Sequence, residues 1–228
     1  MTMPALHDHR YPNESADYRA ARDALLEAEI ALRRQTEAVA AMRRALPPGG
    51  RVEEDYLFEQ AMPGQPGQVR LSELFAPGQD TLVLYNFMYG PNMKQACPSC
   101  TSILDAIDDV VPHARQRIGF AVVARSPLER LLAYARQRGW AHMRLLSSAN
   151  NAYNADYHGE TAEGAQMPML NVFTRRDGEL RHFYGTELMF TKGEDGQDPR
   201  HVDPIWPLWS LLDYTPEGRG DWRPALNY

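Results

Sequence analysis

The chain has 228 residues, of which 43% are hydrophobic and 24% charged, and 24 basic against 30 acidic residues leave a net charge of −6. This length and composition suit a globular protein with one sizeable domain and appendages, or with two small domains. Because acidic and basic residues are interleaved, no basic face is available for phosphate groups, so we expect no nucleic acid and no anionic membrane as a partner.

Residues 1–10 lack the apolar core of a signal peptide, and no later stretch approaches the roughly 18 apolar residues of a membrane span. We therefore expect a cytoplasmic location. There thiols are kept reduced, so two closely spaced cysteines indicate reactive or metal-binding thiols rather than a structural disulfide.

Residues 15–46 predict a long helix, in which seam positions recur at alternating spacings of three and four. The seam consists of Tyr18, Ala21, Leu25, Ala28, Leu32, Gln35, Val39, Met42 and Leu46. The pattern fits a helix packed on its own domain and equally a homodimer contact, because the small alanines weaken the case for a self-sufficient coiled coil. Prolines and glycines at 47–50 end the helix.

The chain beyond this boundary alternates strand and helix patterns. The expected elements are a strand at 55–59, a turn at 63–67, a strand or helical turn at 69–75, a buried strand at 81–88, a helix at 101–116, a buried strand at 118–124, a helix opened by a capping box at Ser126, Pro127 and Glu129 and stopped by Gly139, and a short strand at 143–146. Strand, helix and strand in this order predict a parallel crossover.

The remaining residues predict a polar loop, a hairpin and a final helix. The expected elements are a loop with a turn of helix at 147–166, a strand at 169–174, an Asp-Gly turn within 175–178, a returning strand at 179–184, a polar stretch at 193–199 and an apolar helix at 205–212. We divide the chain into an arm with the long helix (1–48), a central domain (49–195) and a C-terminal loop and helix that pack on the domain or on a partner (196–228).

The two cysteines form the motif Cys97-Pro98-Ser99-Cys100, between a predicted strand and a predicted helix. A C-x-x-C motif at such a junction predicts thiol–disulfide chemistry, because a helix start stabilises the thiolate that this chemistry needs. Pro98 restricts the loop, and Ser99 can cap the helix with its hydroxyl. The plain alternative is a pair of cysteines that only packs.

This order of elements resembles the thioredoxin fold. Thioredoxins carry a proline in a cis peptide directly before the third core strand, facing the cysteines, and Met167-Pro168 stands at that place. The resemblance implies an α/β fold with a central mixed sheet flanked by helices, here with a long N-terminal helix and a C-terminal helical tail.

The same resemblance implies a thiol–disulfide oxidoreductase that needs no cofactor. Cys97 would attack a disulfide and Cys100 would resolve the mixed disulfide. Substrate would be held by Met167, Pro168, Pro98, Ser99 and Asn86. The partner would be a protein or small-molecule disulfide or thiol.

A closer resemblance is to an uncharacterised bacterial family in the thioredoxin-like superfamily, a family without a settled activity. The segments that resemble this family are residues 43–47, 51–56, 85–91, 97–100, 126–129 and 212–219. Three features depart from true thioredoxins. The dipeptide between the cysteines is Pro-Ser and not Gly-Pro, and no tryptophan precedes the motif. Eight residues, 89–96, separate the strand from Cys97, and Asn86 stands where thioredoxins bury an acid, so that general base is missing or replaced.

Three other functions rank lower or stay open. The peroxiredoxin signature is absent, since Pro91 lies six residues before Cys97 and no threonine is in register, so a peroxidase ranks lower. Zinc or copper binding would recruit a histidine, yet His113, His142 and His158 show no ligand spacing, nor does His182, and we predict no metal site. A non-enzymatic scaffold would use the N-terminal helix and the helix containing Trp206 and Trp209 as contact surfaces.

Overall fold

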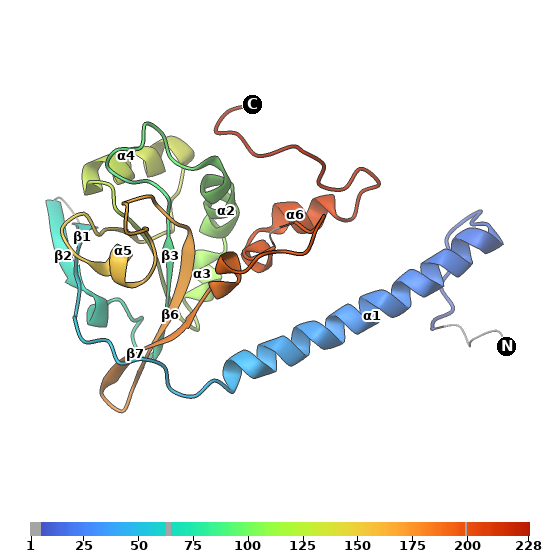
Figure 1. Cartoon of the computed structure of the whole chain (residues 1–228), viewed down its shortest axis with the longest axis horizontal. Helices are drawn as coiled ribbons and strands as arrows, with labels where there is room; N and C mark the ends of the chain where they lie inside the picture. Colours follow the sequence, from blue (N-terminus) through green and yellow to red (C-terminus); the bar gives the residue numbers. More distant parts are fainter. Residues whose placement is uncertain (1–5, 63–64, 199) are drawn as a thin grey trace. The chain divides into compact units, whose positions relative to one another are not determined.

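The structure, a computed structural model, describes residues 6–62, 65–198 and 200–228 and divides into two compact units, residues 1–47 and 48–228 (Figure 1). The first unit is built on helix α1 (Ala16–Arg44), and the predicted long helix is thereby confirmed. Ser15 caps its start, accepting a hydrogen bond from the Tyr18 N–H at 3.1 Å. The helix ends just before the prolines that were expected to stop it.

None of the residues of α1 is buried. The side chains of Leu25, Leu32 and Met42, which belong to the predicted seam, are 49–71% exposed. Packing on the chain's own second unit or pairing with a second copy would each cover such a seam. The homodimer contact through this helix stays a prediction.

We expect the chain to sediment as a dimer and the double variant Leu25→Glu/Leu32→Glu to sediment as a monomer, since two charges at seam positions oppose pairing. Sedimentation velocity at several concentrations measures this. Arg33→Glu, outside the seam, is the matched control and should leave the dimer intact. A monomeric unsubstituted chain at every concentration would remove the helix as a dimer contact.

The second unit contains a seven-stranded sheet and short helices. Its elements are β1 (Leu57–Met62), β2 (Gln65–Arg70), the 3₁₀ turn η1 (Leu71–Glu73), β3 (Thr81–Asn86), α2 (Pro98–Asp108), α3 (Val111–Ala114), β4 (Gly119–Ala124), α4 (Leu128–Arg138), β5 (Leu145–Ser147), α5 (Tyr153–Asp156), β6 (Met169–Arg176), β7 (Glu179–Gly185), the 3₁₀ turns η2 (Glu187–Phe190) and η3 (Asp203–Ile205), and α6 (Pro207–Leu212).

The strands lie in the order β2-β1-β5-β4-β3-β6-β7. Strands β3, β4 and β5 are parallel, whereas β6 is antiparallel to β3, and β7 to β6. The crossover from β3 through α2 to β4, followed by a hairpin on the other side of β3, is the thioredoxin-like arrangement that the resemblance implied. The predicted α/β fold, a mixed central sheet flanked by helices, is confirmed.

The two faces of the sheet bury separate hydrophobic clusters. Leu82 and Leu84 of β3 pack with Phe58 and Phe173 on one face. Tyr85 belongs to the cluster on the other face, which contains Cys100, Ile103 and Leu104 of α2 together with Trp206 and Trp209. Because side chains alternate along a strand, β3 supplies both clusters, and its odd-numbered residues face the cysteines.

Several predicted boundaries were wrong. The helix expected over 101–116 begins at Pro98 and is divided into α2 and α3, since Pro112 has no N–H to continue the ladder. The capping box does not form: α4 begins at Leu128 without a side-chain cap, and the buried Ser126 hydroxyl has no partner in the described chain. Residues 65–67 of the expected turn lie in β2, and residues 63 and 64 lie outside the described residues.

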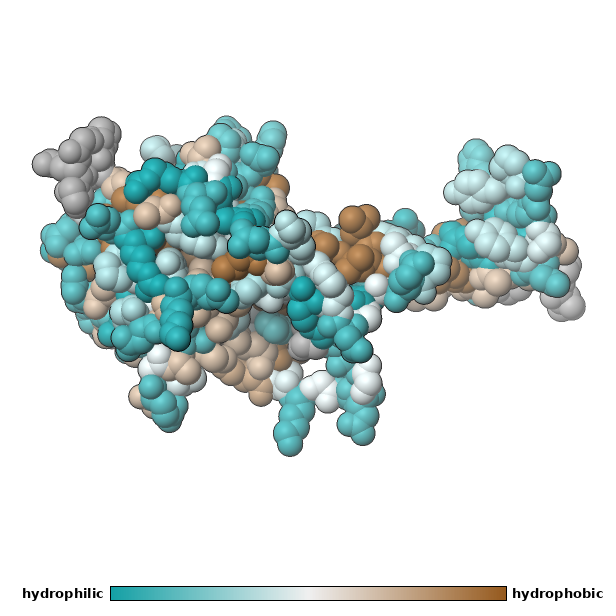
Figure 2. All heavy atoms as spheres, turned by 90° about the horizontal axis from the view of Figure 1, so that it is seen from above, coloured by the Kyte–Doolittle hydropathy of each residue, from teal (hydrophilic) through white to brown (hydrophobic). Residues whose placement is uncertain are grey.

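In the residues that the structure describes, no helix has both the length and the apolar character to cross a bilayer. Hydrophilic side chains dominate the face seen in Figure 2, and hydrophobic ones gather in small areas.

Asp108, at the end of α2, fastens this helix to the segment that enters β5. Its buried carboxylate accepts hydrogen bonds from the N–H groups of Ala141, His142 and Met143 at 2.8–3.0 Å. Its removal would leave three partly buried N–H groups without their partner, and the loss of such hydrogen bonds lowers stability. The contact therefore ties the helix that carries the cysteines to the sheet.

We expect Asp108→Ala to lower the free energy of unfolding by about 3 kcal/mol, as measured by urea denaturation. The neighbouring Asp109, whose side chain is 95% exposed, provides the control, and Asp109→Ala should change stability little. Equal stability of the two variants would contradict the role of Asp108.

Candidate active site

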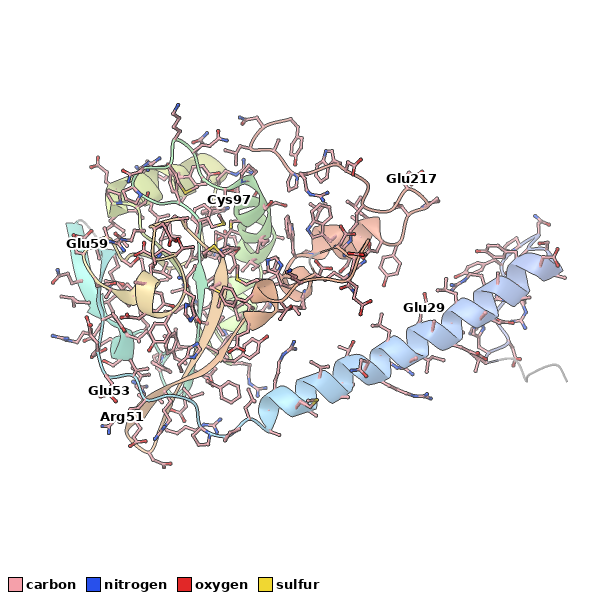
Figure 3. The ribbon with its side chains drawn as sticks, in the orientation of Figure 1. Glu29, Arg51, Glu53, Glu59, Cys97 and Glu217 are labelled. Atoms are coloured by element: carbon pink, nitrogen blue, oxygen red, sulfur yellow. The ribbon has the colours of Figure 1, made fainter. Side chains whose placement is uncertain are left out.

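Cys97 is the residue that caps helix α2. It has extended backbone angles, and its sulfur accepts a hydrogen bond from the Cys100 N–H at 3.5 Å. Thr101 strengthens this turn, since its hydroxyl donates to the Cys97 carbonyl at 2.9 Å and lies 2.8 Å from the Tyr134 hydroxyl. Figure 3 shows Cys97 at the start of α2. The sulfur therefore takes the capping role that was expected of Ser99, which lies inside the helix.

The environment of Cys97 favours its thiolate. Hydrogen bonding to the Cys100 side chain is the main cause, and the N–H groups of Cys100 and Ser99 add to it, so that the pKa of Cys97 is lowered to about 6 although burial opposes the shift. Both cysteines are free thiols, and Cys97 is the more accessible of the two. Near neutral pH Cys97 is therefore largely a nucleophilic thiolate.

Cys100 is buried and behaves in the opposite way. Its hydrogen bond to Cys97 raises its pKa well above the ordinary value, and burial and the charge of Cys97 add to this effect. The Tyr85 hydroxyl acts against the shift and lowers the pKa of Cys100. A thiolate at Cys97 thus opposes the ionisation of Cys100.

Tyr85, which the sequence reasoning missed, lies directly beneath the cysteines. Its side chain is fully buried, and its hydroxyl makes no hydrogen bond of ordinary geometry within the described residues. Burial, followed by the neighbouring Cys100, raises the pKa of Tyr85 well above its usual value, so the hydroxyl keeps its proton. Strand alternation could have found it, since residues 83, 85 and 87 share one face.

Asn86, a predicted substrate contact, lies on the opposite face of β3. Its side-chain oxygen accepts hydrogen bonds from the Tyr153 hydroxyl and from the Asn171 amide, both at 3.4 Å. It is absent from the residues that line the cavity beside the cysteines. The structure therefore brings Tyr85, and not Asn86, to Cys100.

Of the other predicted substrate contacts, two line the cavity beside the cysteines and two do not. Pro168 and Ser99 line the cavity with both cysteines, whereas Met167 and Pro98 are not among its lining residues. All peptide bonds of the described residues are trans, so the cis peptide implied for Met167-Pro168 was wrong. Pro168 still reaches the cavity beside Cys97 because β6 starts one residue later, next to β3.

The C-terminal segment covers this site. A cavity of about 280 Å³ lies between the cysteines and residues of segment 198–223, among them Trp206, Trp209 and Arg223. The Trp206 indole N–H donates to the Ser102 hydroxyl of α2 at 3.1 Å, so α6 lies beside α2 (Figure 1). The apolar C-terminal helix, expected to pack on the domain or on a partner, packs here against the helix of the cysteines.

The long loop at 89–96 is held in place from α4. The Arg130 guanidinium donates to the carbonyl oxygens of Gly90, Pro91 and Met93, and it stacks on the Tyr89 ring at 4.2 Å. The Cys97 N–H donates to the Met88 carbonyl at 3.1 Å and so joins the end of the loop to its start. The approach to Cys97 is thereby fixed by hydrogen bonds.

Among the described residues, neither cysteine belongs to a group of three possible metal ligands. Within the described residues, one group of three possible ligands lies within reach of a single ion, and it consists of Asp108, Asp109 and His142. The Asp108 carboxylate of that group already accepts three backbone N–H groups. The alternative of a Cys/His site therefore lacks its further ligands in this arrangement.

No curated protein matches the chain. Among solved structures it is similar to AhpC of Enterococcus faecalis, with 10% identity, a TM-score of 0.46 and coverage of 78% of this chain and 98% of that chain. It is also similar to thioredoxin peroxidase I of Plasmodium yoelii, with 16% identity, a TM-score of 0.46 and coverage of 78% and 100%. A mutant of peroxiredoxin Q of Xanthomonas campestris has 15% identity, a TM-score of 0.45 and coverage of 72% and 96%. Likenesses at this level carry no argument about the site.

The sequence itself matches one family over almost its whole length. Residues 8–227 fit the profile of a bacterial protein family of unknown function, DUF899. The chain therefore belongs to the DUF899 family.

Proposed function

We propose that the protein is a thiol–disulfide oxidoreductase in which Cys97 is the nucleophile and Cys100 the resolving thiol. The observation that carries this proposal is the opposite environment of the two sulfurs. Cys97 is an accessible helix cap with a pKa of about 6, and Cys100 is buried with a pKa well above the ordinary value. Two cysteines that only pack would have no reason to differ in this way.

In the first step the Cys97 thiolate attacks one sulfur of a substrate disulfide. A Cys97–substrate disulfide forms, and the other half of the substrate leaves as a thiolate. The backbone N–H groups at the start of α2 hold the Cys97 thiolate before attack. This step needs no group besides those that the site provides.

The first step also prepares the second. The main influences that hold the pKa of Cys100 high, apart from burial, come from the Cys97 thiolate, and they vanish once Cys97 is bonded to substrate. The Tyr85 hydroxyl then remains as a group that stabilises a Cys100 thiolate. Cys100 attacks Cys97, the Cys97–Cys100 disulfide forms, and the second half of the substrate leaves as a thiolate.

Alkylation by iodoacetamide tests the first step. Because the pKa of Cys97 is lowered to about 6, its alkylation rate should rise with pH, reach half its maximum near pH 6 and level off by about pH 8. Cys100 should react slowly throughout, since its pKa is raised. Peptide mass spectrometry after short labelling pulses measures both rates.

Cys100→Ser is the sharpest control for this experiment. It removes the thiol that contributes most to the lowered pKa of Cys97, so the midpoint of Cys97 alkylation should move to higher pH. Cys97→Ser should abolish reduction of a small disulfide. Equal and slow alkylation of both cysteines, with a midpoint near the ordinary cysteine pKa of about 8.5, would refute the proposed function.

Tyr85→Phe tests the second step. We expect about tenfold slower release of the second thiolate from an aromatic disulfide such as 5,5′-dithiobis(2-nitrobenzoate), because loss of a hydrogen bond to a charged group costs about 1.5 kcal/mol or more. Release of the first thiolate should stay unchanged, since Tyr85 contacts Cys100. Stopped-flow absorbance separates the two phases, and the pH midpoint of the second should rise.

Tyr153→Phe is the matched control. It also removes a hydroxyl from a fully buried tyrosine, but this hydroxyl donates to Asn86 on the other face of the sheet. It should leave both phases and the pH midpoint unchanged. If Tyr85→Phe slowed both phases alike, its effect would be structural and Tyr85 would have no specific part in resolution.

A further inference from the structure

The wall that the C-terminal segment builds over Cys97 is part of the fold. Val202, Trp206 and Trp209 are buried in the same cluster as Cys100 and Ile103 of α2. Arg138 of α4 also donates to the Leu226 carbonyl at 2.9 Å, which fixes the chain near its end. Cys97 therefore opens into a cavity and not onto a flat surface.

An ion-pair network stiffens this wall. The Arg219 guanidinium donates to the carboxylates of Asp203 and Asp213 at 2.6 and 2.7 Å, and Arg200 pairs with the same two carboxylates. The network contains two positive and two negative groups. The two carboxylates therefore neutralise the charge of Arg219, although its side chain lines the cavity. It is not available to attract a ligand.

The size of the cavity limits what can reach Cys97. Its volume of about 280 Å³ is close to the lower end of small-molecule pockets, which hold about 300–1,000 Å³. Trp206 and Trp209 line this cavity together with both cysteines and are buried in the same cluster as Cys100, so they narrow the space beside the sulfurs. A compact disulfide fits this space, and a disulfide within a folded protein does not.

Two charged residues of the lining remain without an ion-pair partner in the part of the chain that the structure describes. The Arg223 guanidinium donates to the carbonyl oxygens of Gly220 and Trp222, at 3.2 and 2.7 Å, and has no carboxylate within ion-pair distance. Asp198 likewise takes part in no ion pair there. The lining of the cavity that Cys97 shares thus contains one positive and one negative group outside any ion pair of the described residues, and the Arg223 guanidinium also lies 5.5 Å from the centre of the Trp209 ring.

We propose that this cavity binds a small disulfide of the amino-acid type, with Arg223 recognising its carboxylate and Asp198 its ammonium group. The proposal rests on the proposed function and names the substrate class of the same site. Reduced protein and one such disulfide, RSSR, give the Cys97–Cys100 disulfide and two RSH. The two electrons come from the cysteines, so one turnover needs no other reductant.

Four small aliphatic disulfides test recognition of the carboxylate and recognition of the ammonium group independently. Cystine carries both groups, 3,3′-dithiodipropionate the carboxylates, cystamine the ammonium groups, and bis(2-hydroxyethyl) disulfide neither. Each is mixed in excess with pre-reduced full-length protein, and the second-order rate of Cys97–Cys100 oxidation is measured by rapid quench and mass spectrometry. Rates of each variant are divided by its rate with the neutral disulfide, so that intrinsic reactivity cancels.

We expect Arg223→Gln to lower the normalised rates of oxidation by cystine and by dithiodipropionate about five- to tenfold. The rate with cystamine should stay unchanged. Asp198→Asn should lower the rates with cystine and with cystamine by a similar factor and leave the rate with dithiodipropionate unchanged. Arg176→Gln, at an exposed arginine at the far end of β6, is the matched control and should change none of the rates.

Three results would overturn the proposal. In the first, the neutral disulfide reacts as fast as cystine in the unsubstituted protein. In the second, both charge variants slow all four disulfides alike. In the third, reduction of insulin disulfides outpaces that of cystine. If no disulfide oxidises the cysteines at all, the proposed function itself is wrong and this inference falls with it, which is distinct from exchange without charge selectivity.

Discussion

The hydrogen bond between the two cysteine side chains at the start of α2 is the interaction on which the chemistry of this site depends. It lowers the pKa of Cys97 and raises that of Cys100 by the same contact, so the pair holds one negative charge at a time. In such a pair the two thiols react in a defined order, because the pKa of the second thiol falls only after the first has reacted. Accessibility adds to this order, since Cys97 faces the cavity and Cys100 is buried.

The sheet determines what lies beneath that pair. Strand β3 lies between β4 and β6 in the sheet, and a buried hydrophobic cluster covers each of its two faces. Tyr85 reaches Cys100, and the next residue, Asn86, joins a polar group with Tyr153 and Asn171 on the opposite face. A neutral phenol therefore lies next to Cys100, whereas Asn86, which stands where thioredoxins bury an acid, lies on the other face of the sheet. A phenol can donate a hydrogen bond to a thiolate but does not accept its proton at neutral pH.

The C-terminal segment gives the site its boundaries. Trp206 bonds to α2 itself, and a network of arginines and aspartates holds the wall that faces Cys97. The same segment supplies the apolar surface and the charged groups of the cavity. Specificity in this chain would therefore come from residues about a hundred positions beyond the cysteines, in a segment where the sequence showed an apolar helix without showing what that helix packs against.

The long helix and the C-x-x-C motif at a strand-to-helix junction follow from local periodicity and turn residues, and the parallel crossover follows from the succession of strand, helix and strand. The thioredoxin resemblance added the mixed sheet, whereas the order of its seven strands came only with the structure. Pro168 was likewise expected near the cysteines, and it lines their cavity. Only the folded chain shows that Cys97 and not Ser99 caps the helix, that Tyr85 and not Asn86 lies next to Cys100, and that Arg223 and Asp198 line the same cavity as Cys97. Those facts depend on the face of a buried strand and on contacts between distant segments, and local pattern specifies neither the direction of a single side chain nor the partner of an apolar helix.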